Sequence, residues 1–309
     1  MQARLPPMRH HVPPQARMLA RQVRSDHRLP DDGRRALANL TRLEKAYRKA
    51  MSPDVPSYDV SCIQGVDFDE WLYTEGLGCF IGFTQSVEIN ARLLLAAGDW
   101  TGEHRVDHAA AIRAGLRDKW ALPALAIDRG LKVFFPPGNN IGWIINTDHV
   151  LRAFRLDASW RLKPHPITSD EDVHQAKLAF GVTRICDRDT SGMALLRAAE
   201  EIGYTTASEM GLVGMVLGKP ATDFSKFEFE SHGRYHALYY AVRRIGRPEA
   251  LLNRWVNCPW SGIVPLDMPN DEALERFRQY KARTLELRRR YEPLTSHVPR
   301  PPAPQGGGP

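Results

Sequence analysis

From about residue 130 onward, short apolar segments alternate with stretches of helical periodicity, and this alternation restricts the possible folds more than any other feature. The expected strands are Leu131–Phe135, Trp160–Leu162, Val182–Cys186 and Tyr204–Thr206, and the expected helices cover 147–156, 170–180, 191–202 and 209–217. Strands separated by helices of about ten residues are typical of a parallel, doubly wound sheet. The sequence therefore predicts an α/β fold whose ligands bind at the carboxyl ends of its strands.

The rest of the 309-residue chain divides by composition. Residues 1–32 are rich in Pro, Arg and His without a hydrophobic period, which predicts a basic, poorly ordered arm. We expect a smaller N-terminal α/β lobe over 33–128 and a Rossmann-like lobe over 129–292, whose last part, from Gly233, is mostly helical. The Pro- and Gly-rich residues 293–309 predict a disordered tail.

Charge and cysteine content bear on partners and location. The net charge of +6 favours anionic partners such as nucleic acid or phosphorylated substrates, although a modest arginine excess without any partner explains it equally well. The sequence contains no apolar run near the ~20 residues that span a bilayer, and no secretory signal is recognisable. The four cysteines are widely spaced and form no CxxC pair, which predicts free thiols and a cytoplasmic protein. The spacing of His104, Asp107 and His108 could suggest a metal site, but it is a weak signal without a clear third ligand, so we assign no metal.

The first candidate motif is Lys163-Pro164-His165-Pro166, directly after an expected strand. Lysine supplies a point charge for a phosphate, and histidine can donate to a phosphate oxygen or transfer a proton. The prolines fix the backbone and remove N–H donors that would compete. The competing interpretation is a plain surface turn.

The second candidate motif begins about forty residues later, where a strand passes into a helix. Thr205, Thr206 and Ser208 supply hydroxyls, and the first helical turn supplies N–H groups, which together would bind an anion. Gly211 and Gly214 would allow a ligand or the sheet to approach the helix closely, and Gly218-Lys219-Pro220 ends that helix. Alternatively, the Thr and Ser residues are simple helix caps.

Together these motifs resemble the capsular-polysaccharide-type glycosyltransferases, in which a strand ends in Lys-Pro-His-Pro and a later Ser-x-x-Gly opens a helix that ends in Gly-Lys-Pro. The match covers roughly residues 130–225. The resemblance implies a GT-B-like fold and a nucleotide-sugar donor held by Lys163, His165 and the Ser208 turn, without any other cofactor. The family usually has an acidic ribose-binding residue inside the helix, where this chain has Val213, and Glu209 is the candidate substitute.

The predicted function is transfer of a sugar from a nucleotide-sugar donor to an acceptor hydroxyl. The expected catalytic residues are His165 and a carboxylate of the N-terminal lobe, with Asp67 as the first candidate base. Asp67, Asp69 and Glu70 also fit a solvated acidic loop. Two acceptors remain open, namely a glycan, as the resemblance implies, and a hydroxymethylated base in DNA, which is consistent with the basic chain. The alternatives are a non-catalytic nucleotide- or nucleic-acid-binding module and a sugar-nucleotide epimerase.

Overall fold

The computed structural model describes residues 70–74, 76–84, 86–114, 130–137, 148–188, 190–225 and 235–291, together with Met18. The expected arm at 1–32, apart from Met18, the tail at 293–309 and the candidate base Asp67 lie outside these residues.

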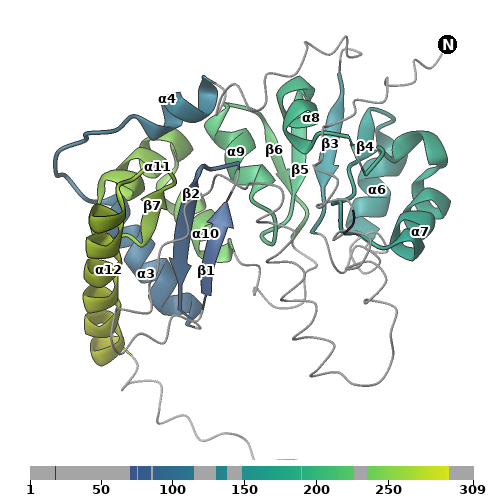
Figure 1. Cartoon of the computed structure of the whole chain (residues 1–309). Helices are drawn as coiled ribbons and strands as arrows, with labels where there is room; N and C mark the ends of the chain where they lie inside the picture. Colours follow the sequence, from purple (N-terminus) through teal and green to yellow (C-terminus); the bar gives the residue numbers. More distant parts are fainter. Residues whose placement is uncertain are drawn as a thin grey trace, which may run out of the picture.

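A four-stranded parallel sheet confirms the predicted α/β class. Its strands are β3 (Lys132–Phe135), β4 (Trp160–Leu162), β5 (Glu201–Tyr204) and β6 (Ala221–Asp223). Their order is β4-β3-β5-β6, and every neighbouring pair is parallel (Figure 1). An isolated parallel bridge joins Leu162 to Ile185 and adds a short segment beside β4.

Helices cover both faces of this sheet, and the side chains of β3 point alternately toward the two faces. Phe134 packs in one cluster with residues of α6 (Asp148–Leu156) and α7 (Asp170–Phe180). Val133 and Phe135 pack in another cluster with residues of α8 (Gly192–Ala198) and α9 (Met210–Val216). The continuous apolar run of β3, from Val133 to Phe135, thus comes from burial on both sides.

Two of the elements predicted for the part of the chain that forms the parallel sheet are wrong. The expected strand Val182–Cys186 is a 3-10 turn over Val182–Arg184 that follows Gly181, whose φ is 90°. The expected helix 191–202 ends at Ala198, and β5 begins at Glu201 instead of Tyr204. Tertiary pairing decides this boundary, because Glu201 lies opposite Lys132 on β3 and their side chains form an ion pair of 2.5 Å.

A second, antiparallel sheet joins the start and the end of the described chain. It has the order β1-β2-β7, formed by β1 (Glu70–Thr74), β2 (Cys79–Phe83) and β7 (Ile263–Pro265). Sequence reasoning missed the three-residue strands β7 and β6. The elements before residue 128 therefore share a sheet with the segment after Gly233, whose described residues are mostly helical, as expected.

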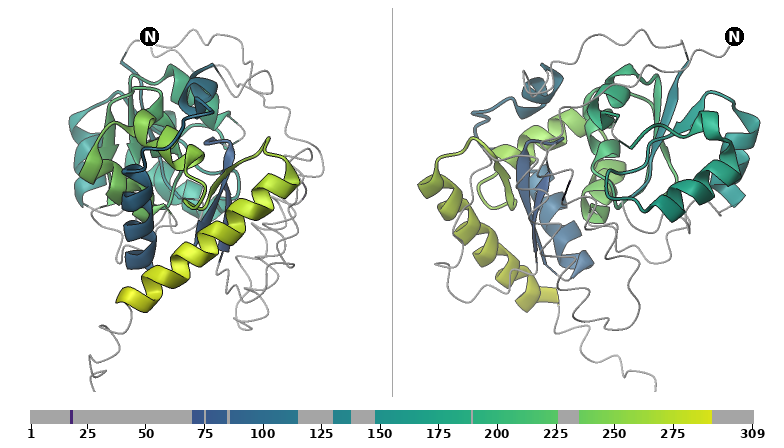
Figure 2. Two further views of the ribbon diagram at one scale, coloured as in Figure 1. Left: turned by 90° about the vertical axis from the view of Figure 1, so that its left-hand side faces the viewer. Right: turned by 45° about the vertical axis from the view of Figure 1, so that its right-hand side comes forward.

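In the part of the chain that the structure describes, five helices accompany the antiparallel sheet: α3 (Val87–Gly98), α4 (His108–Arg113), α10 (His236–Ile245), α11 (Pro248–Asn257) and α12 (Asn270–Tyr291). Helix α3 packs against α10, α11 and α12. Figure 2 shows α12 along the outer side of this layer, away from the parallel sheet.

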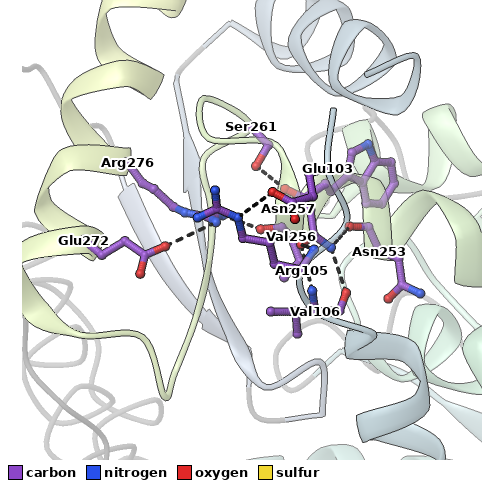
Figure 3. Close-up of polar contacts among 10 residues, drawn as sticks. Glu103, Arg105, Val106, Asn253, Val256, Asn257, Ser261, Glu272 and Arg276 are labelled. Carbon is purple, nitrogen blue, oxygen red and sulfur yellow. Dashed lines mark hydrogen bonds and ion pairs between the residues drawn. The ribbon is translucent and has the colours of Figure 1, made fainter. Parts of the chain in front are cut away.

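Polar contacts fix α12 and the segment before α4 to the end of α11 (Figure 3). Asn257 Oδ1 accepts from the N–H groups of Arg105 at 2.8 Å and Val106 at 3.0 Å, and Asn257 Nδ2 donates to Val106 O at 2.8 Å. From α12, the Arg276 guanidinium donates to Val256 O and lies 3.6 Å from a carboxylate oxygen of Glu272. Arg276 is therefore an internal anchor.

Within the described residues, no helix is long and apolar enough to cross a membrane. Cys79, Cys186 and Cys258 are free thiols, and Cys62 lies outside the described residues.

We expect part of the stability to depend on Asp157, at the amino-terminal edge of the parallel sheet. Its carboxylate accepts from Ser159 Oγ at 2.5 Å and Ser159 N–H at 2.8 Å and lies 3.1 Å from Lys132 Nζ, and these contacts lower its pKa from 3.8 to about 2. Because the pKa is depressed in the folded state, this stabilisation is complete above the unfolded pKa and is lost as the pH falls toward 2. Asp157→Asn should therefore lower the unfolding free energy at pH 7, by under about 1 kcal/mol because the carboxylate is partly exposed.

Urea unfolding of both proteins at pH 7, 4 and 2.5 would measure this difference, which should shrink as the pH falls. A difference that stays constant over this range would contradict the assignment.

Candidate functional site

The candidate site is the carboxyl edge of the parallel sheet, at the point where its crossovers reverse direction. The connection from β3 leads to β4 on one side, whereas β5 adds to the other side of β3 (Figure 1). Ligands of doubly wound sheets bind in this place. The two sequence motifs follow β4 and β5 directly. Because only β3 separates these strands, the motifs begin about 10 Å apart, which is two strand spacings.

Lys163 begins the segment after β4 and is almost fully buried, with 4% of its surface exposed. Its N–H donates to Phe134 O at 2.9 Å and so extends the pairing of β4 with β3. Its Nζ donates to the carbonyl oxygens of Pro164 at 2.5 Å and Arg188 at 3.0 Å. The ammonium group thus holds the Arg188 segment against the end of β4, and it brings a positive charge to the edge.

His165 is the exposed member of the first motif. Its Nδ1 accepts the Ile167 N–H at 3.2 Å, and its carbonyl oxygen accepts the Thr168 N–H at 2.9 Å, which closes a turn. Since Nδ1 accepts, the neutral ring carries its proton on Nε2, and Nε2–H is a donor. The turn therefore orients an imidazole donor at the edge of the sheet.

Arg188 is a residue of this edge that sequence reasoning missed. Its guanidinium donates to Thr168 O at 2.8 Å and forms an ion pair with Asp170. Arg188 follows Ile185, which forms the parallel bridge to β4. Lys163 was selected as a polar residue just after a strand, and the same criterion would have selected Arg188. The β4 side thus carries two cations, Lys163 and Arg188, together with the neutral His165 donor, and these three residues are called the cationic group below.

The segment after β5 supplies hydroxyl groups. Thr205 is fully buried, and its Oγ1 has no hydrogen-bond partner among the described residues. Its carbonyl oxygen accepts the Ser208 N–H at 3.0 Å, and Ser208 Oγ accepts the Met210 N–H at 3.3 Å. Thr206 is also buried, and its carbonyl oxygen accepts the Tyr235 N–H at 3.1 Å.

The Tyr239 hydroxyl binds backbone groups at the start of α9. Its hydroxyl donates to Ser208 O at 2.7 Å and accepts the Leu212 N–H at 3.1 Å, and its ring stacks on Tyr204 at 4.6 Å between centroids. Burial raises the pKa of Tyr239 well above its ordinary value, so the hydroxyl keeps its proton. The N–H groups of Met210 and Leu212 are thus bound internally, whereas the sequence analysis expected this first turn to supply N–H groups to an anion.

Gly211 is required by this packing. A Cβ at Gly211 would lie 2.3 Å from the Tyr239 hydroxyl oxygen and 2.4 Å from Tyr204 Cγ. The expected close approach at Gly211 therefore occurs, but its partners are two aromatic rings of the protein itself.

Glu209 connects this edge to the antiparallel sheet. Its Oε1 accepts the Gly76 N–H at 3.2 Å in the turn between β1 and β2. Val213 is fully buried, and a Cβ at Gly76 would lie 2.8 Å from Val213 Cγ2. The hairpin turn thus covers the position where the resembling family carries its acidic residue, and a carboxylate there would be desolvated.

The hairpin turn is also held by His108. Its ring Nε2 lies 2.6 Å from Leu77 O and donates to it, because a carbonyl oxygen can only accept. Strand β1 runs from Glu70 to Thr74, so the Thr74 end is the one that reaches this turn. Asp67 precedes the other end of β1 and lies outside the described residues.

Replacing Thr205 by valine is expected to raise the unfolding free energy by about 1 kcal/mol, because it removes a buried hydroxyl without a described partner. If this hydroxyl serves a ligand, Thr205→Val will at the same time weaken nucleotide binding. Chemical unfolding and calorimetric titration with nucleoside diphosphates would measure the two effects. A loss of stability would show that the hydroxyl has a structural partner.

The edge thus combines an exposed imidazole, a guanidinium and an ammonium group with a buried hydroxyl on the far side of β3. It can bind an anion on the β4 side and a polar group on the β5 side. A comparison with known proteins finds no matching family, no matching curated protein and no matching solved structure.

Proposed function

We propose that this protein is a glycosyltransferase that moves a sugar from a nucleotide-sugar donor to an acceptor hydroxyl. One observation carries the proposal: the Lys163–Pro166 segment and the Thr205–Gly211 segment both follow strands that flank β3 in one parallel sheet. Segments about forty residues apart thus lie at one ligand-binding edge, as their resemblance to the capsular-type transferases requires.

The cationic group on the β4 side suits the diphosphate of the donor. In this proposal His165 donates through Nε2–H to a phosphate oxygen, because its imidazole is the exposed member of the group. Lys163 and Arg188 add positive potential and stabilise the negative charge that develops on the leaving nucleoside diphosphate. The hydroxyls of Thr205 and Ser208 hydrogen-bond to the remaining polar groups of the donor, and the Glu209 carboxylate binds its ribose hydroxyls.

The acceptor is activated by a carboxylate from the N-terminal part of the chain, with Asp67 as the first candidate. For direct displacement, the acceptor hydroxyl gives its proton to the carboxylate, its oxygen forms a bond to the anomeric carbon, and the bond from that carbon to the diphosphate oxygen breaks. The proposal includes two acceptor classes, a glycan and a hydroxymethylated base in DNA.

Mass spectrometry of acceptors incubated with a panel of nucleotide sugars tests the proposal. The acceptors are hydroxymethylcytosine DNA, hydroxymethyluracil DNA, unmodified DNA and simple glycans. The expected result is a gain of one sugar mass on one acceptor class. Nucleotide binding without transfer would instead indicate a binding module, and conversion of the donor without an acceptor would indicate an epimerase.

A further inference from the structure

The positive charge of the described chain is concentrated in α12 from Arg276 onward. Between residues 276 and 290 there are seven Lys or Arg residues and one Glu. The described residues between 148 and 225, around the parallel sheet, contain nine basic and ten acidic residues. The excess is therefore a local feature of α12, separate from the candidate donor site.

Part of this charge forms a stripe along one face of the helix. Arg278, Lys281 and Arg289 follow the spacing i, i+3 and i+11, with Leu285 at i+7, which places all four on the same side of an α-helix. A different face, centred about 120° around the helix from the stripe, holds the buried residues of α12, which are Ala273, Phe277, Tyr280, Thr284 and Leu287. Arg278 and Arg289 are exposed, and Lys281, at the edge of the stripe nearest the buried face, is half-buried.

The charges of this stripe are only weakly compensated. Arg278 forms an ion pair of 3.2 Å with Glu275, in which both side chains are more than half exposed. No described carboxylate lies within ion-pair distance of Lys281 or Arg289. Arg276 differs from these residues because it points inward and donates to Val256 O (Figure 3).

The geometry of the stripe favours a linear polyanion over a small anion. From Arg278 to Arg289 the helix rises about 16 Å, so the three cations cannot converge on one phosphate. A nucleic-acid duplex presents about one negative charge per 1.7 Å of its axis and can contact all three.

The apolar residues of α12 argue against a membrane surface as the partner. A helix that lies on a membrane inserts apolar side chains between the lipids. Here Phe277, Tyr280 and Leu287 are buried within the protein, and the exposed large apolar residue of the stripe is Leu285, at 37%.

We propose that the outward face of α12, defined by Arg278, Lys281 and Arg289, binds the phosphate backbone of a nucleic acid. This inference rests on the charge distribution and the packing of α12, and it does not depend on the proposed transferase activity. If both proposals hold, the protein has separate surfaces for a donor and for a nucleic-acid acceptor.

Binding of the full chain to labelled oligonucleotides tests this inference. Fluorescence anisotropy would be measured with duplex DNA, single-stranded DNA and duplex RNA between 50 and 200 mM salt. The test variant is Arg278→Gln/Lys281→Gln/Arg289→Gln, and the matched control is Arg152→Gln/Arg155→Gln/Arg197→Gln, which removes three exposed cations around the parallel sheet. Both variants leave the basic residues of the 1–32 segment unchanged.

The test variant should bind at least about tenfold more weakly than wild type at low salt, and its slope of log affinity against log salt should be less steep by up to about 2.7. The control should keep the wild-type slope. Circular dichroism should show that both variants are folded. The nucleic acid that binds most tightly would then identify which of the three classes the protein prefers.

The inference would be overturned if the wild type bound none of these oligonucleotides, or if both variants lost affinity equally. It would also be overturned if anionic vesicles, and not nucleic acid, distinguished the test variant from the control. Since no sugar donor is present, none of these outcomes depends on transferase activity.

Discussion

Replacing Gly211 by alanine is expected to destabilise the protein by about 2 kcal/mol, because the added methyl group would overlap two buried aromatic side chains. The Cβ would lie 2.3 Å from the Tyr239 hydroxyl oxygen, and this hydroxyl holds both Ser208 O and the Leu212 N–H. Overpacking and the disturbed hydrogen bonds together cost about 3 kcal/mol, and the better helix propensity of alanine offsets only about 1 kcal/mol of this. Chemical unfolding of the two proteins would measure the difference.

Gly218→Ala is the matched control for this prediction. Gly218 has a φ of 74°, but nothing lies within 4 Å of the position that its Cβ would take. Its substitution should therefore cost only the strain of a left-handed residue, about 1 kcal/mol. In addition, Gly211→Ala should cost less in a Tyr239→Phe background, where the overlapping hydroxyl is absent. Equal costs for Gly211→Ala and Gly218→Ala would contradict the packing role of Gly211.

Replacing His165 by glutamine should weaken binding of a nucleotide-sugar donor by about 10- to 100-fold, which corresponds to the loss of one hydrogen bond to a charged group. The fold should remain intact, because His165 is exposed and its ring contributes only an acceptor for the Ile167 N–H. Calorimetric titration with nucleoside diphosphates and thermal unfolding would measure affinity and stability separately.

His174→Gln is the control, since His174 is also exposed and lies on α7 beside the same sheet. It should leave affinity unchanged. Lys163→Ala should behave differently from His165→Gln and lower stability as well as affinity, because its buried Nζ holds the carbonyl oxygens of Pro164 and Arg188. Unchanged affinity in His165→Gln would remove His165 from the donor site.

Much of the parallel-sheet half was predictable from local pattern. The helix over 170–180 is observed as Asp170–Phe180, where Ser169 caps the first turn by accepting the Asp172 N–H at 3.0 Å. Strand β3 follows an apolar run that is buried on both sides, and such a run needs no tertiary information to be recognised. The position of both motifs at the carboxyl edge followed from the order of these elements.

The boundaries of β5 and the existence of β6 and β7 were not predictable in this way. Strand β5 begins at Glu201 because its residues pair with β3, and Gly203 lets Phe224 pack where a Cβ would lie only 2.4 Å from that ring. Strand β7 has three residues, and its partner β2 lies some 180 residues earlier in the sequence. A pairing over this distance leaves no local periodicity.

The sequence by itself determined the parallel α/β architecture and the two polar segments at one edge, because strand and helix periods and turn residues are local properties. Only the tertiary structure decided what each polar group does. Lys163 Nζ is bound to carbonyl oxygens that come from two segments, the start of α9 is closed by Tyr239, and Glu209 joins the hairpin turn at Gly76. Apart from Pro164, these partners lie 25 to 133 residues away in the sequence, and burial rather than residue type selects them.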